Sequence, residues 1–456
     1  MLDPITIKER VLRHDRAVPR YTSYPTAPQF QVDFPAATQT TWLDGLQDGS
    51  ALSLYVHIPY CPQLCTYCGC FTRITTRYAP VEDYLHLLRR EIQQMGARLG
   101  QKQHVTHLHF GGGSPTMLLP KDFALLVATL RENFRITDAS EIAVEIDPRA
   151  VTAELAAVYA DAGVTRISLG VQDFDDQVMT AVNRRQPFEV VYRARQMLGE
   201  AGIAACNLDF IYGLPYQTVR SLTRTMDYAM LLKPQRIALY GYAHVPWKKR
   251  NIRLVPEAAL PDASLRYDLF QTASGVLEGA GLVPLGIDHF ARPDDPMALA
   301  AATAKLGRNF QGYTDQAPDA LLGFGQSAIS QFPQGYTQNT LDSGAYEQAV
   351  LQGQTPLAKG YAFNGEDQAR KAIIDTLMTM LRVDAAAIWS AHGHDPTTLR
   401  AALLRLQPLQ QDGLLTVQDG VISLPLAARP VVRLAAAAFD AYLPTQEDTP
   451  RHARAV

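Results

Sequence analysis

Apolar runs rich in β-favouring residues alternate with amphipathic stretches through the first half of the chain, and this alternation constrains the fold more than any other feature. The apolar runs cover residues 51–59, 104–110, 141–147, 166–172, 206–212 and 236–243, and the amphipathic stretches cover 81–99, 123–134, 151–163, 188–202 and 219–232. Repeated strand–helix alternation predicts an α/β fold with a parallel sheet and right-handed crossovers. Six units are too few for a closed eight-stranded barrel, so we expect a partial (β/α)6 TIM-like barrel or an open sheet. Residues 321–330 are a candidate for a last strand or a lining segment.

The pattern along the whole chain predicts three parts. Residues 1–45 precede the first apolar run and form a predicted N-terminal arm, and residues 46–365 form the α/β domain. From residue 366 the pattern changes to helices followed by a short hairpin, which predicts a small, mostly helical, winged-helix-like domain over 366–456. Its basic residues are scattered among acids and the formal net charge is −3, so we expect no nucleic-acid partner.

Several patterns bear on location and assembly. Residues 1–20 are charged and lack the apolar segment of a secretory signal, and no apolar run reaches the length of a membrane span. Four of the five cysteines are crowded into one loop, and a single one, Cys206, lies elsewhere. We therefore expect a reducing, cytoplasmic location and no membrane span. No exposed heptad pattern indicates obligate assembly, so a monomer is expected.

The cysteine-rich loop CPQLCTYCGC spans residues 61–70. Cys61, Cys65 and Cys68 have the spacing C-x3-C-x2-C, and Cys70 follows two residues later. Four thiolates could close a zinc tetrahedron or act as redox thiols, but zinc sites usually divide their ligands between two separate turns. Three thiolates on one loop can hold three corners of an iron–sulfur cube and leave one iron with an open coordination position, which is the favoured interpretation.

Polar and glycine residues recur where the predicted strands end. The second strand ends in Gly111-Gly112-Gly113-Ser114, and the sixth ends near Tyr242-Ala243-His244. Between these, Glu145, Gln172 and Asp209 end or precede the end of successive strands. Each feature alone has a simpler interpretation, since the glycines could form a tight turn and Glu145 a structural salt bridge. Because parallel α/β sheets place their ligands at the carboxyl ends of strands, the recurrence predicts a site there.

The loop Cys61-Pro-Gln-Leu-Cys65-Thr-Tyr67-Cys68 resembles the signature of radical S-adenosylmethionine (SAM) enzymes. Over almost the whole chain, the sequence further resembles the oxygen-independent coproporphyrinogen III oxidase family within that superfamily. The matching motifs are RYTSYPTA (20–27), YVHIPYC (55–61), CGC (68–70), HFGGGSPT (109–116), EIDPR (145–149), SLGVQDF (168–174), VNR (182–184), LDFIYGLP (208–215), YAH (242–244), DHFARPDD (288–295), RNFQGYT (308–314) and LLGFGQSAIS (321–330). RYTSYPT, CGC and RNFQGYT make the likeness specific.

The resemblance implies the cofactors and the reaction. Cys61, Cys65 and Cys68 would bind a [4Fe–4S] cluster, whose fourth iron would chelate SAM through its amino and carboxylate groups. One electron, from a flavodoxin- or ferredoxin-like donor, would cleave SAM to a 5′-deoxyadenosyl radical, which takes hydrogen from a propionate β-carbon. Loss of CO2 and one electron leaves a vinyl group. Two such reactions convert the substrate, coproporphyrinogen III, to protoporphyrinogen IX in anaerobic haem biosynthesis.

The resemblance also assigns residues for two SAM molecules in the active site of the radical SAM domain at 46–365. Contacts to the first would come from Tyr55, Gly111, Gly112, Glu145 and Ile329, and contacts to the second from Tyr67, Gly113, Ser114, Gln172, Arg184, Asp209 and Ala243. Arg20 and Tyr21 of the arm would cover the porphyrinogen, although an extended arm packed on the surface is an equal alternative. These two residues and Cys70, which would lie outside the cluster's coordination shell, are the candidate catalytic residues.

Two departures from the family pattern concern the substrate. Gln326 replaces a small apolar residue near Ile329, and residues 244–251 carry a cationic Lys-Lys-Arg run that could meet propionates or simply face solvent. A haem chaperone and another radical SAM tetrapyrrole enzyme, such as one that methylates haem and opens its ring, are the alternative functions. The CGC extension disfavours the chaperone, where phenylalanine typically occupies the position of Cys70, and RYTSYPT with RNFQGYT favours the oxidase.

Overall fold

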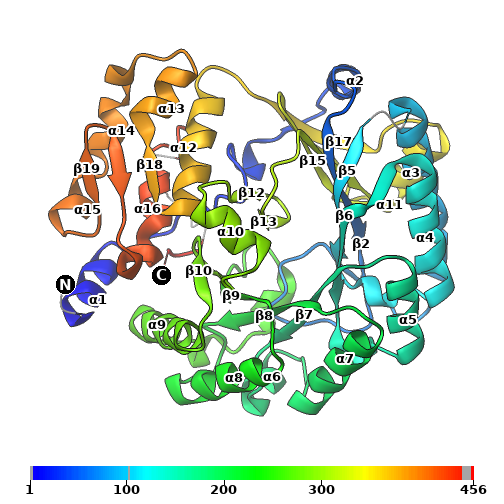
Figure 1. The fold of residues 1–456 in the computed structure, drawn as a ribbon, viewed down its shortest axis with the longest axis horizontal. Coiled ribbons are helices and arrows are strands. Elements are labelled where there is room, and N and C mark those ends of the chain that lie inside the picture. The colour runs from blue at the N-terminus through cyan, green and yellow to red at the C-terminus, as the bar shows by residue number, and fades with distance from the viewer. Residues whose placement is uncertain (1–3, 101–102, 444–452, 456) are drawn as a thin grey trace.

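The computed structural model describes residues 4–100, 103–443 and 453–455. Six parallel strands lie in the sheet in chain order: β2 (Ala51–Ile58), β5 (His104–Gly112), β6 (Arg135–Ile146), β7 (Arg166–Gln172), β8 (Ala205–Tyr212) and β9 (Arg236–Gly241). Each overlaps a run predicted from the sequence, although β6 begins six residues before its predicted run, and each pairs in parallel with the next. Figure 1 shows this sheet curving through the centre of the molecule. The predicted α/β architecture is therefore confirmed.

The sheet continues beyond both edges of this parallel core. On the β2 side it adds β14 (Ala320–Phe324) in parallel, which confirms the predicted last strand, and then β15 (Ile329–Phe332), β16 (Gly335–Asn339), β17 (Leu357–Ala362) and β1 (Gln31–Val32) in antiparallel order. On the β9 side it adds β11 (His289–Ala291) and β10 (Val283–Leu285). In the described part of the chain, the end strands β1 and β10 do not pair with one another. The six units thus form a partial barrel that stays open.

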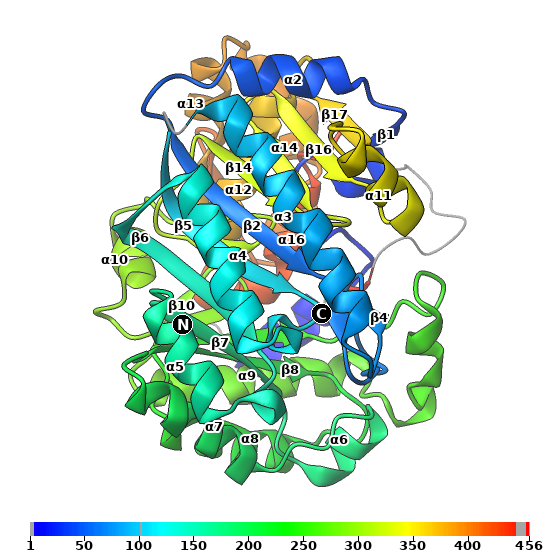
Figure 2. The ribbon, with the colours of Figure 1, turned by 90° about the vertical axis from the view of Figure 1, so that its right-hand side faces the viewer.

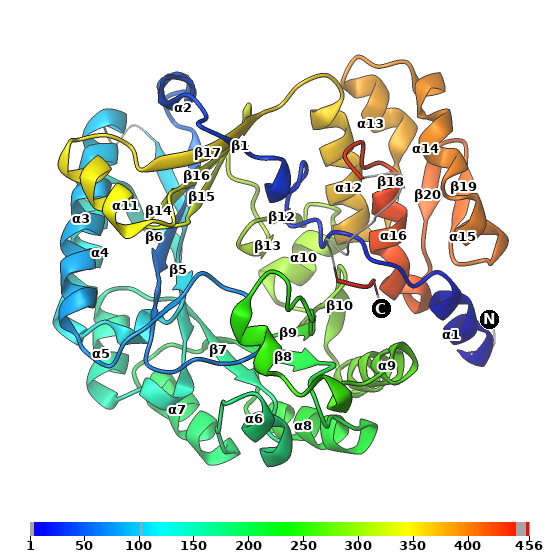
Figure 3. The same ribbon diagram turned by 180° about the vertical axis from the view of Figure 1, so that it is seen from behind.

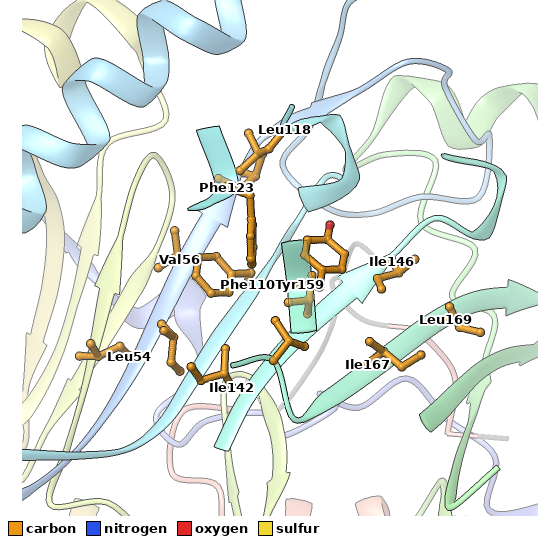
Figure 4. Packing of buried hydrophobic residues seen from close by; sticks show 14 of the residues in the cluster. Leu54, Val56, Phe110, Leu118, Phe123, Ile142, Ile146, Tyr159, Ile167 and Leu169 are labelled. Atoms are coloured by element: carbon orange, nitrogen blue, oxygen red, sulfur yellow. The ribbon is translucent and has the colours of Figure 1, made fainter. Parts of the chain in front are cut away.

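Helices cover the outer face of the parallel strands (Figure 2). They are α3 (Ala79–Leu99), α4 (Pro120–Asn133), α5 (Ala153–Asp161), α7 (Phe188–Glu200) and α8 (Val219–Leu231), each near a predicted amphipathic stretch. Leu54 and Val56 of β2 and Phe110 of β5 are fully buried, and Phe110 contacts Phe123 of α4 with 5.1 Å between ring centroids. Figure 4 shows this packing between strands and helices. Burial of these apolar side chains stabilises the outer layer.

The inner face of the same strands is polar. Successive strand residues point to opposite faces of a sheet. On β5, His107 and His109 alternate with the buried Leu108 and Phe110, and on β7 Ser168 lies between the buried Ile167 and Leu169. The outer positions therefore form the core, and the inner positions line the interior of the partial barrel.

The C-terminal residues form a separate hydrophobic cluster. The elements there are α12 (Asp367–Met380), β18 (Arg382–Asp384), α13 (Ala385–Ala391), α14 (Arg400–Leu404), α15 (Gln407–Gln411), β19 (Thr416–Gln418), β20 (Val421–Ser423) and α16 (Val432–Ala437). The three strands pair antiparallel in the order β18-β20-β19. Trp389, Ile374 and Val431 are buried in the cluster. The boundaries at residues 46 and 366 and the winged-helix likeness stay predictions.

The N-terminal segment connects the two parts. Helix α1 (Pro4–Arg13) contributes Val11 to the C-terminal cluster, and Val18, Tyr21 and Tyr24 follow it there. The chain then crosses to β1 and to α2 (Ala36–Asp44), as Figure 3 shows. Trp42 of α2 packs on the sheet core. The segment called an arm is therefore integrated into both parts of the protein.

The remaining helices and strands are shorter or lie in the connections. They are β3 (Tyr60–Cys61), β4 (Arg73–Ile74), α6 (Asp176–Ala181), α9 (Ala263–Gly279), α10 (Pro296–Ala302), β12 (Gly307–Asn309), β13 (Gly312–Thr314) and α11 (Ser343–Leu351). Over the described ranges, no helix combines the length and apolar character that crossing a membrane requires.

Candidate active site

The cysteine loop follows β2 and is held at both ends by the short parallel pair β3–β4. The Cys68 N–H donates to the Cys65 carbonyl at 3.2 Å. The Asn251 side-chain amide donates to the carbonyls of Cys65, Thr66 and Cys68 at 3.4, 3.1 and 2.8 Å. Lys249 of the predicted cationic run donates to the Cys70 carbonyl at 3.2 Å. The segment that departs from the family pattern therefore supports the backbone of the cysteine loop.

The four thiols of this loop line one cavity of about 180 Å³, here called the cysteine-loop cavity. Burial and the neighbouring Cys68 and Cys65 raise the pKa of Cys61 to about 12. A hydrogen bond from the Cys70 thiol lowers the pKa of Cys68, and the same bond raises that of Cys70. Arg184 Nη1 donates to Cys65 Sγ at 3.6 Å. Three cysteine sulfurs on one loop beside a guanidinium group form a donor set suited to a cationic iron cluster, which would bind them as thiolates.

The three glycines at the end of β5 leave no room for side chains. A Cβ at Gly111 would lie 2.8 Å from Glu145 Oε1, and one at Gly113 would lie 2.8 Å from the Tyr60 carbonyl oxygen. Gly112 has φ +111°, and a Cβ there would lie 2.5 Å from His57 Cε1. A tight turn alone would not require glycine at all three positions. At each one, a Cβ would contact a neighbouring side chain or backbone atom too closely. The glycines bring the β5 backbone against the carboxylate and the cysteine loop.

Two carboxylates face the cavity from neighbouring parts of the sheet. Glu145 accepts hydrogen bonds from His109 Nε2 at 3.1 Å and from the Gly112 N–H at 3.2 Å. Burial would raise the pKa of Glu145, but the hydrogen bond and charge of His109, with the Gly112 N–H, bring it below its usual value. Asp209 accepts from Ser168 at 2.8 Å, and burial raises its pKa to about 6 despite that bond. The site thus holds one firmly ionised carboxylate and one that titrates near neutrality.

The structure brings most of the predicted site residues together. Those that line the cysteine-loop cavity are Cys61, Cys65, Tyr67, Cys68, Cys70, Gly112, Gly113, Ser114, Glu145, Gln172, Arg184 and Asp209. Gly111 lies directly beside the Glu145 carboxylate. Tyr55 does not line the cavity but contacts residues next to it. Its hydroxyl donates to His57 Nδ1 at 3.1 Å, and its ring stacks on the ring of His109.

Four predicted residues lie elsewhere. Ile329 of β15 packs against the cluster formed by Phe30, Tyr336 and Tyr361, and Ala243 follows β9 outside the cavity lining. Tyr21 is buried in the C-terminal cluster, where its hydroxyl donates to Asp440 at 3.0 Å. Arg20 lines a different cavity and donates to the Gly241 carbonyl. The arm residues are therefore placed away from the cysteine loop.

Sequence reasoning missed several side chains that support the site. His57, His109 and Ser168 contact predicted residues, and Asn207 donates to Asp209 at 2.7 Å. The signal was present for these four, because each is a polar residue at an alternate position in an otherwise apolar strand. Asn251 lies in a connection without periodicity, and its contact with the cysteine loop had no comparable signal.

Gln326, the other departure, does not face the cavity. It is 1% exposed, and its side-chain amide donates to the Leu341 carbonyl at 3.3 Å and to Ser343 at 3.2 Å. The glutamine therefore fastens the connection that precedes α11. These contacts, which form just after the end of β14, explain the glutamine at this position.

Comparisons with known proteins agree with this geometry. Residues 55–229 match the radical SAM superfamily. The chain is 44% identical over 442 residues to an oxygen-independent coproporphyrinogen III oxidase of Bradyrhizobium diazoefficiens, covering 97% of this chain and 98% of that protein. It is 38% identical over 434 residues to the protein of the same name from Paracoccus denitrificans, covering 95% and 96%.

A solved structure extends the likeness to three dimensions. The Escherichia coli coproporphyrinogen III oxidase, described as a radical SAM enzyme, superposes with a TM-score of 0.88 at 35% identity. The match covers 94% of this chain and 100% of that one, so it includes the arm, the partial barrel and the C-terminal part together. The chain therefore belongs to the oxygen-independent coproporphyrinogen III oxidase family of radical SAM enzymes.

Proposed function

We propose that this protein oxidatively decarboxylates two propionates of coproporphyrinogen III to vinyl groups, giving protoporphyrinogen IX. One observation carries the proposal: relatives named for this activity match the chain over nearly its full length, and the cysteine loop, glycine strand end and carboxylates face one cavity. A match to the superfamily alone would leave the substrate open. The end-to-end likeness includes the arm and C-terminal parts, which lie outside residues 55–229.

The residues present fit both cofactors that the family implies. Cys61, Cys65 and Cys68 offer three thiols on one wall of the cavity, which matches a [4Fe–4S] cluster with one iron left for SAM. When bound, the reduced cluster and SAM supply a carbon-centred radical that abstracts hydrogen from a propionate β-carbon, after which CO2 and one electron are lost. The chain's own contribution is to bind, orient and shield the reacting groups.

The charges around the cavity match the parts of SAM. Glu145 stays ionised and can accept from an ammonium group, and Arg184 can pair with a carboxylate. Asp209 can accept from ribose hydroxyls, since Ser168 and Asn207 hold its carboxylate in place. The glycines at 111–113 admit close approach of a ligand to the backbone.

We assign two SAM molecules to the site, as the resemblance implies. Gly112 and Glu145 would contact the first, and Ser114, Gln172 and Arg184 the second. Glu145 near the end of β6 and Gln172 at the end of β7 both line the cysteine-loop cavity, so adjacent strand ends support the two sets of contacts. Cys70 lies exposed beside Cys68 and is assigned a role outside the cluster's coordination shell.

The remaining features of the proposal concern the cellular setting. We propose a cytoplasmic monomer that receives electrons from a flavodoxin- or ferredoxin-like donor. Residues 46–365 would form the catalytic domain, and residues 1–45 and 366–456 would close the porphyrinogen side of the site. The integration of α1 and Tyr21 into the C-terminal cluster supports treating those two segments as one covering unit.

The test is anaerobic incubation of the reconstituted protein with SAM, a reductant and coproporphyrinogen III, followed by porphyrin analysis. One protoporphyrinogen IX should accompany two 5′-deoxyadenosines when uncoupled SAM cleavage is low, because each propionate consumes one SAM. A haem chaperone would bind haem and form no vinyl product, and a ring-opening enzyme would consume haem and leave coproporphyrinogen unchanged. Absence of vinyl product from protein with a fully loaded cluster would refute the proposal.

A further inference from the structure

A second cavity lies where the arm, the ends of β8 and β9 and the C-terminal part meet. It has a volume of about 120 Å³ and is here called the arginine cavity. Its lining includes six arginines: Arg20, Arg266, Arg308, Arg429, Arg433 and Arg454. Asp288 is the one carboxylate among the described lining residues. A concentration of guanidinium groups of this kind is typical of sites for carboxylates or phosphates.

Arg429 gives the clearest evidence that this cavity suits an anion. Its side chain is buried, with 2% of the residue exposed, and Nε donates to the Ile287 carbonyl at 3.0 Å. Nη2 has no hydrogen-bond partner among the described residues. The guanidinium lies over the rings of Phe270 and Phe290 at 5.1 and 4.7 Å. An unpartnered N–H on a buried cation is costly, so a ligand that accepts from Nη2 would explain its position.

The neighbouring arginines hold the backbone and leave positive charge in the cavity. Arg308 Nη1 donates to the carbonyls of Arg20 and Tyr21 at 3.2 and 3.3 Å, and Arg433 Nε donates to the Pro19 carbonyl at 3.0 Å. Within the described ranges, none of Arg20, Arg308, Arg429 and Arg433 forms an ion pair with a carboxylate. Burial and the charge of Arg20 lower the pKa of Arg433 to about 9, which reflects this uncompensated charge.

Asp288 offsets only part of this charge. Its carboxylate accepts a hydrogen bond from Nδ1 of the adjacent residue, His289, at 2.8 Å. Arg454 lies at the rim and pairs with Asp15 at 2.5 Å. Arg20, Arg308, Arg429 and Arg433 therefore carry more positive charge than Asp288 alone offsets, as binding of an anion with more than one carboxylate would require.

The arginine cavity and the cysteine-loop cavity each share lining residues with a third cavity. Tyr240 lines both the arginine cavity and a central cavity of about 140 Å³ inside the partial barrel. Glu145, Ser168 and Asp209 line both that central cavity and the cysteine-loop cavity. A ligand that extends from the SAM side of the barrel to the arm side would therefore place one end among the arginines.

Three family motifs that have no cofactor role converge here. Arg20 belongs to RYTSYPT, Arg308 to RNFQGYT and Asp288 to DHFARPDD. RYTSYPT precedes the other two segments by more than 260 residues in the chain. The arm reaches the cavity because Val18 and Tyr21 pack into the C-terminal cluster. The arm thus has a physical reason to lie here rather than at the cysteine loop.

We propose that the arginine cavity binds the carboxylates of the porphyrinogen propionates that are not reacting, and thereby directs the reacting propionate toward the cysteine-loop cavity. The inference rests on the proposed function for the identity of the tetrapyrrole. The recognition chemistry is charge-assisted hydrogen bonding from Arg429, Arg308 and Arg20 to carboxylate oxygens. A substrate with four propionates matches a cavity that presents several guanidinium groups.

The test uses the reconstituted holoenzyme and coproporphyrin III, the stable aromatic form of the tetrapyrrole, titrated by fluorescence quenching. Arg429→Gln and Arg308→Gln should each weaken binding of the tetraacid about ten- to hundredfold, because each removes a charged donor. Arg429→Lys should retain more of the affinity than Arg429→Gln. The matched control is Arg224→Gln, since the Arg224 side chain is 60% exposed, pairs with Asp175 and does not line any of the three cavities. SAM affinity should stay unchanged in all four variants.

A second measurement needs no variant and covers the case in which a glutamine variant fails to fold. Coproporphyrin III should bind the wild-type holoenzyme more tightly than its tetramethyl ester, and only the tetraacid should weaken as salt is raised. Equal affinity of the tetraacid and the ester would overturn the inference. Displacement by millimolar inorganic phosphate, with no difference between the two porphyrins, would also overturn it and would indicate a phosphate site.

The outcomes separate this inference from the proposed function. Normal vinyl formation with unchanged tetraacid affinity in Arg429→Gln and Arg308→Gln would refute the arginine cavity and leave the oxidase activity standing. Selective loss of tetraacid binding in the same variants, with no vinyl product even from wild type, would support the cavity and refute the activity.

Discussion

At the scale of single residues, the four thiols of the 61–70 loop should differ in their effect on the cluster. Cys61→Ala, Cys65→Ala and Cys68→Ala should each abolish the thiolate-to-iron absorbance near about 400 nm and most of the roughly four irons per chain. Cys70→Ala should keep both, because the C-x3-C-x2-C spacing already supplies three ligands. Cys206→Ala is the control, since Cys206 is buried in β8 within the sheet core. Anaerobic iron and sulfide analysis is the measurement, and cluster loss in Cys70→Ala would contradict the ligand assignment.

The two carboxylates predict a pH dependence of SAM binding. Burial raises the pKa of Asp209 to about 6, so this carboxylate is ionised above that pH and protonated below it. If it accepts hydrogen bonds from SAM, affinity should fall as the pH drops through about 6. Glu145 should stay ionised over this range, because its pKa lies below its usual value. Anaerobic calorimetry from pH 5 to 8 should show this fall in wild type and a weaker, flatter profile in Asp209→Asn, whereas parallel profiles would exclude Asp209.

The residue types of the site could largely be predicted from the sequence, but their partners could not. Twelve predicted residues line one cavity, because the carboxyl ends of parallel strands meet at the same edge of the sheet. Residues that end successive strands are therefore close in space. The prediction for Tyr21 could not anticipate Asp440, which lies 419 residues away in the chain. A pairing of this kind depends on how two separate parts of the protein pack, which no local pattern encodes.

At the scale of elements, the end of β5 should tolerate no side chain at its middle glycine. Gly112→Ala would place a methyl group in contact with His57 at a φ of +111°, so both sterics and backbone conformation oppose it. We expect a loss of about 1–3 kcal/mol in stability and at least tenfold weaker SAM binding. Gly275→Ala in α9 is the matched control, since a Cβ there meets nothing within 4 Å and alanine favours helix. Thermal unfolding and calorimetry are the measurements, and equal behaviour of the two variants would contradict the steric argument.

A buried acid on α3, Glu91, holds that helix against the turn between β14 and β15. Glu91 accepts from the Gly325 N–H, Asn339 and Tyr346 at 2.8, 2.7 and 2.6 Å. Burial nevertheless raises its pKa from 4.5 to about 7. Between these values the folded protein holds a proton that the unfolded chain lacks, so this group's contribution to stability falls as pH rises from 4.5 to 7.

Glu91→Gln should therefore remove a pH-dependent term of roughly 3 kcal/mol, the size that a shift of this extent implies. Relative to wild type, the variant should gain stability as the pH rises from 5 to 8, whatever its absolute stability. Urea unfolding at both pH values is the measurement. The same change with pH in wild type and variant would show that Glu91 is not the titrating group.

Most strands of the parallel core could be predicted closely, while those at the edges could not. β2, β5, β7 and β8 begin within one residue of the predicted runs, whereas β6 begins at Arg135, before the predicted start at residue 141. β10, β11 and β15–β17 are short and pair antiparallel. Short strands of this kind are stabilised by the neighbouring strand rather than by their own sequence pattern.

At the scale of the whole molecule, the first 44 residues join parts that the sequence presents as separate. The Ala441 N–H donates to the Tyr24 hydroxyl at 3.0 Å, and Arg433 donates to the Pro19 carbonyl at 3.0 Å. The same segment then adds β1 to the sheet edge. Deleting it would therefore expose the C-terminal cluster as well as uncover the site, so loss of activity after deletion would not isolate a substrate role.

Hydrogen exchange on the intact holoenzyme separates the two ligands without a deletion. SAM should slow amide exchange in residues 61–70 and 111–116, because those segments form the cysteine-loop cavity. Coproporphyrin III should slow exchange in residues 18–24 and 429–433, because the arm and the C-terminal part meet at the arginine cavity. Protection of the arm by a tetrapyrrole requires that both segments close over the same ligand, since each contributes arginines to one cavity. Porphyrin-dependent protection confined to residues 61–70 would place the whole substrate at the cysteine loop and contradict the division of the molecule into a radical-generating side and a carboxylate-binding side.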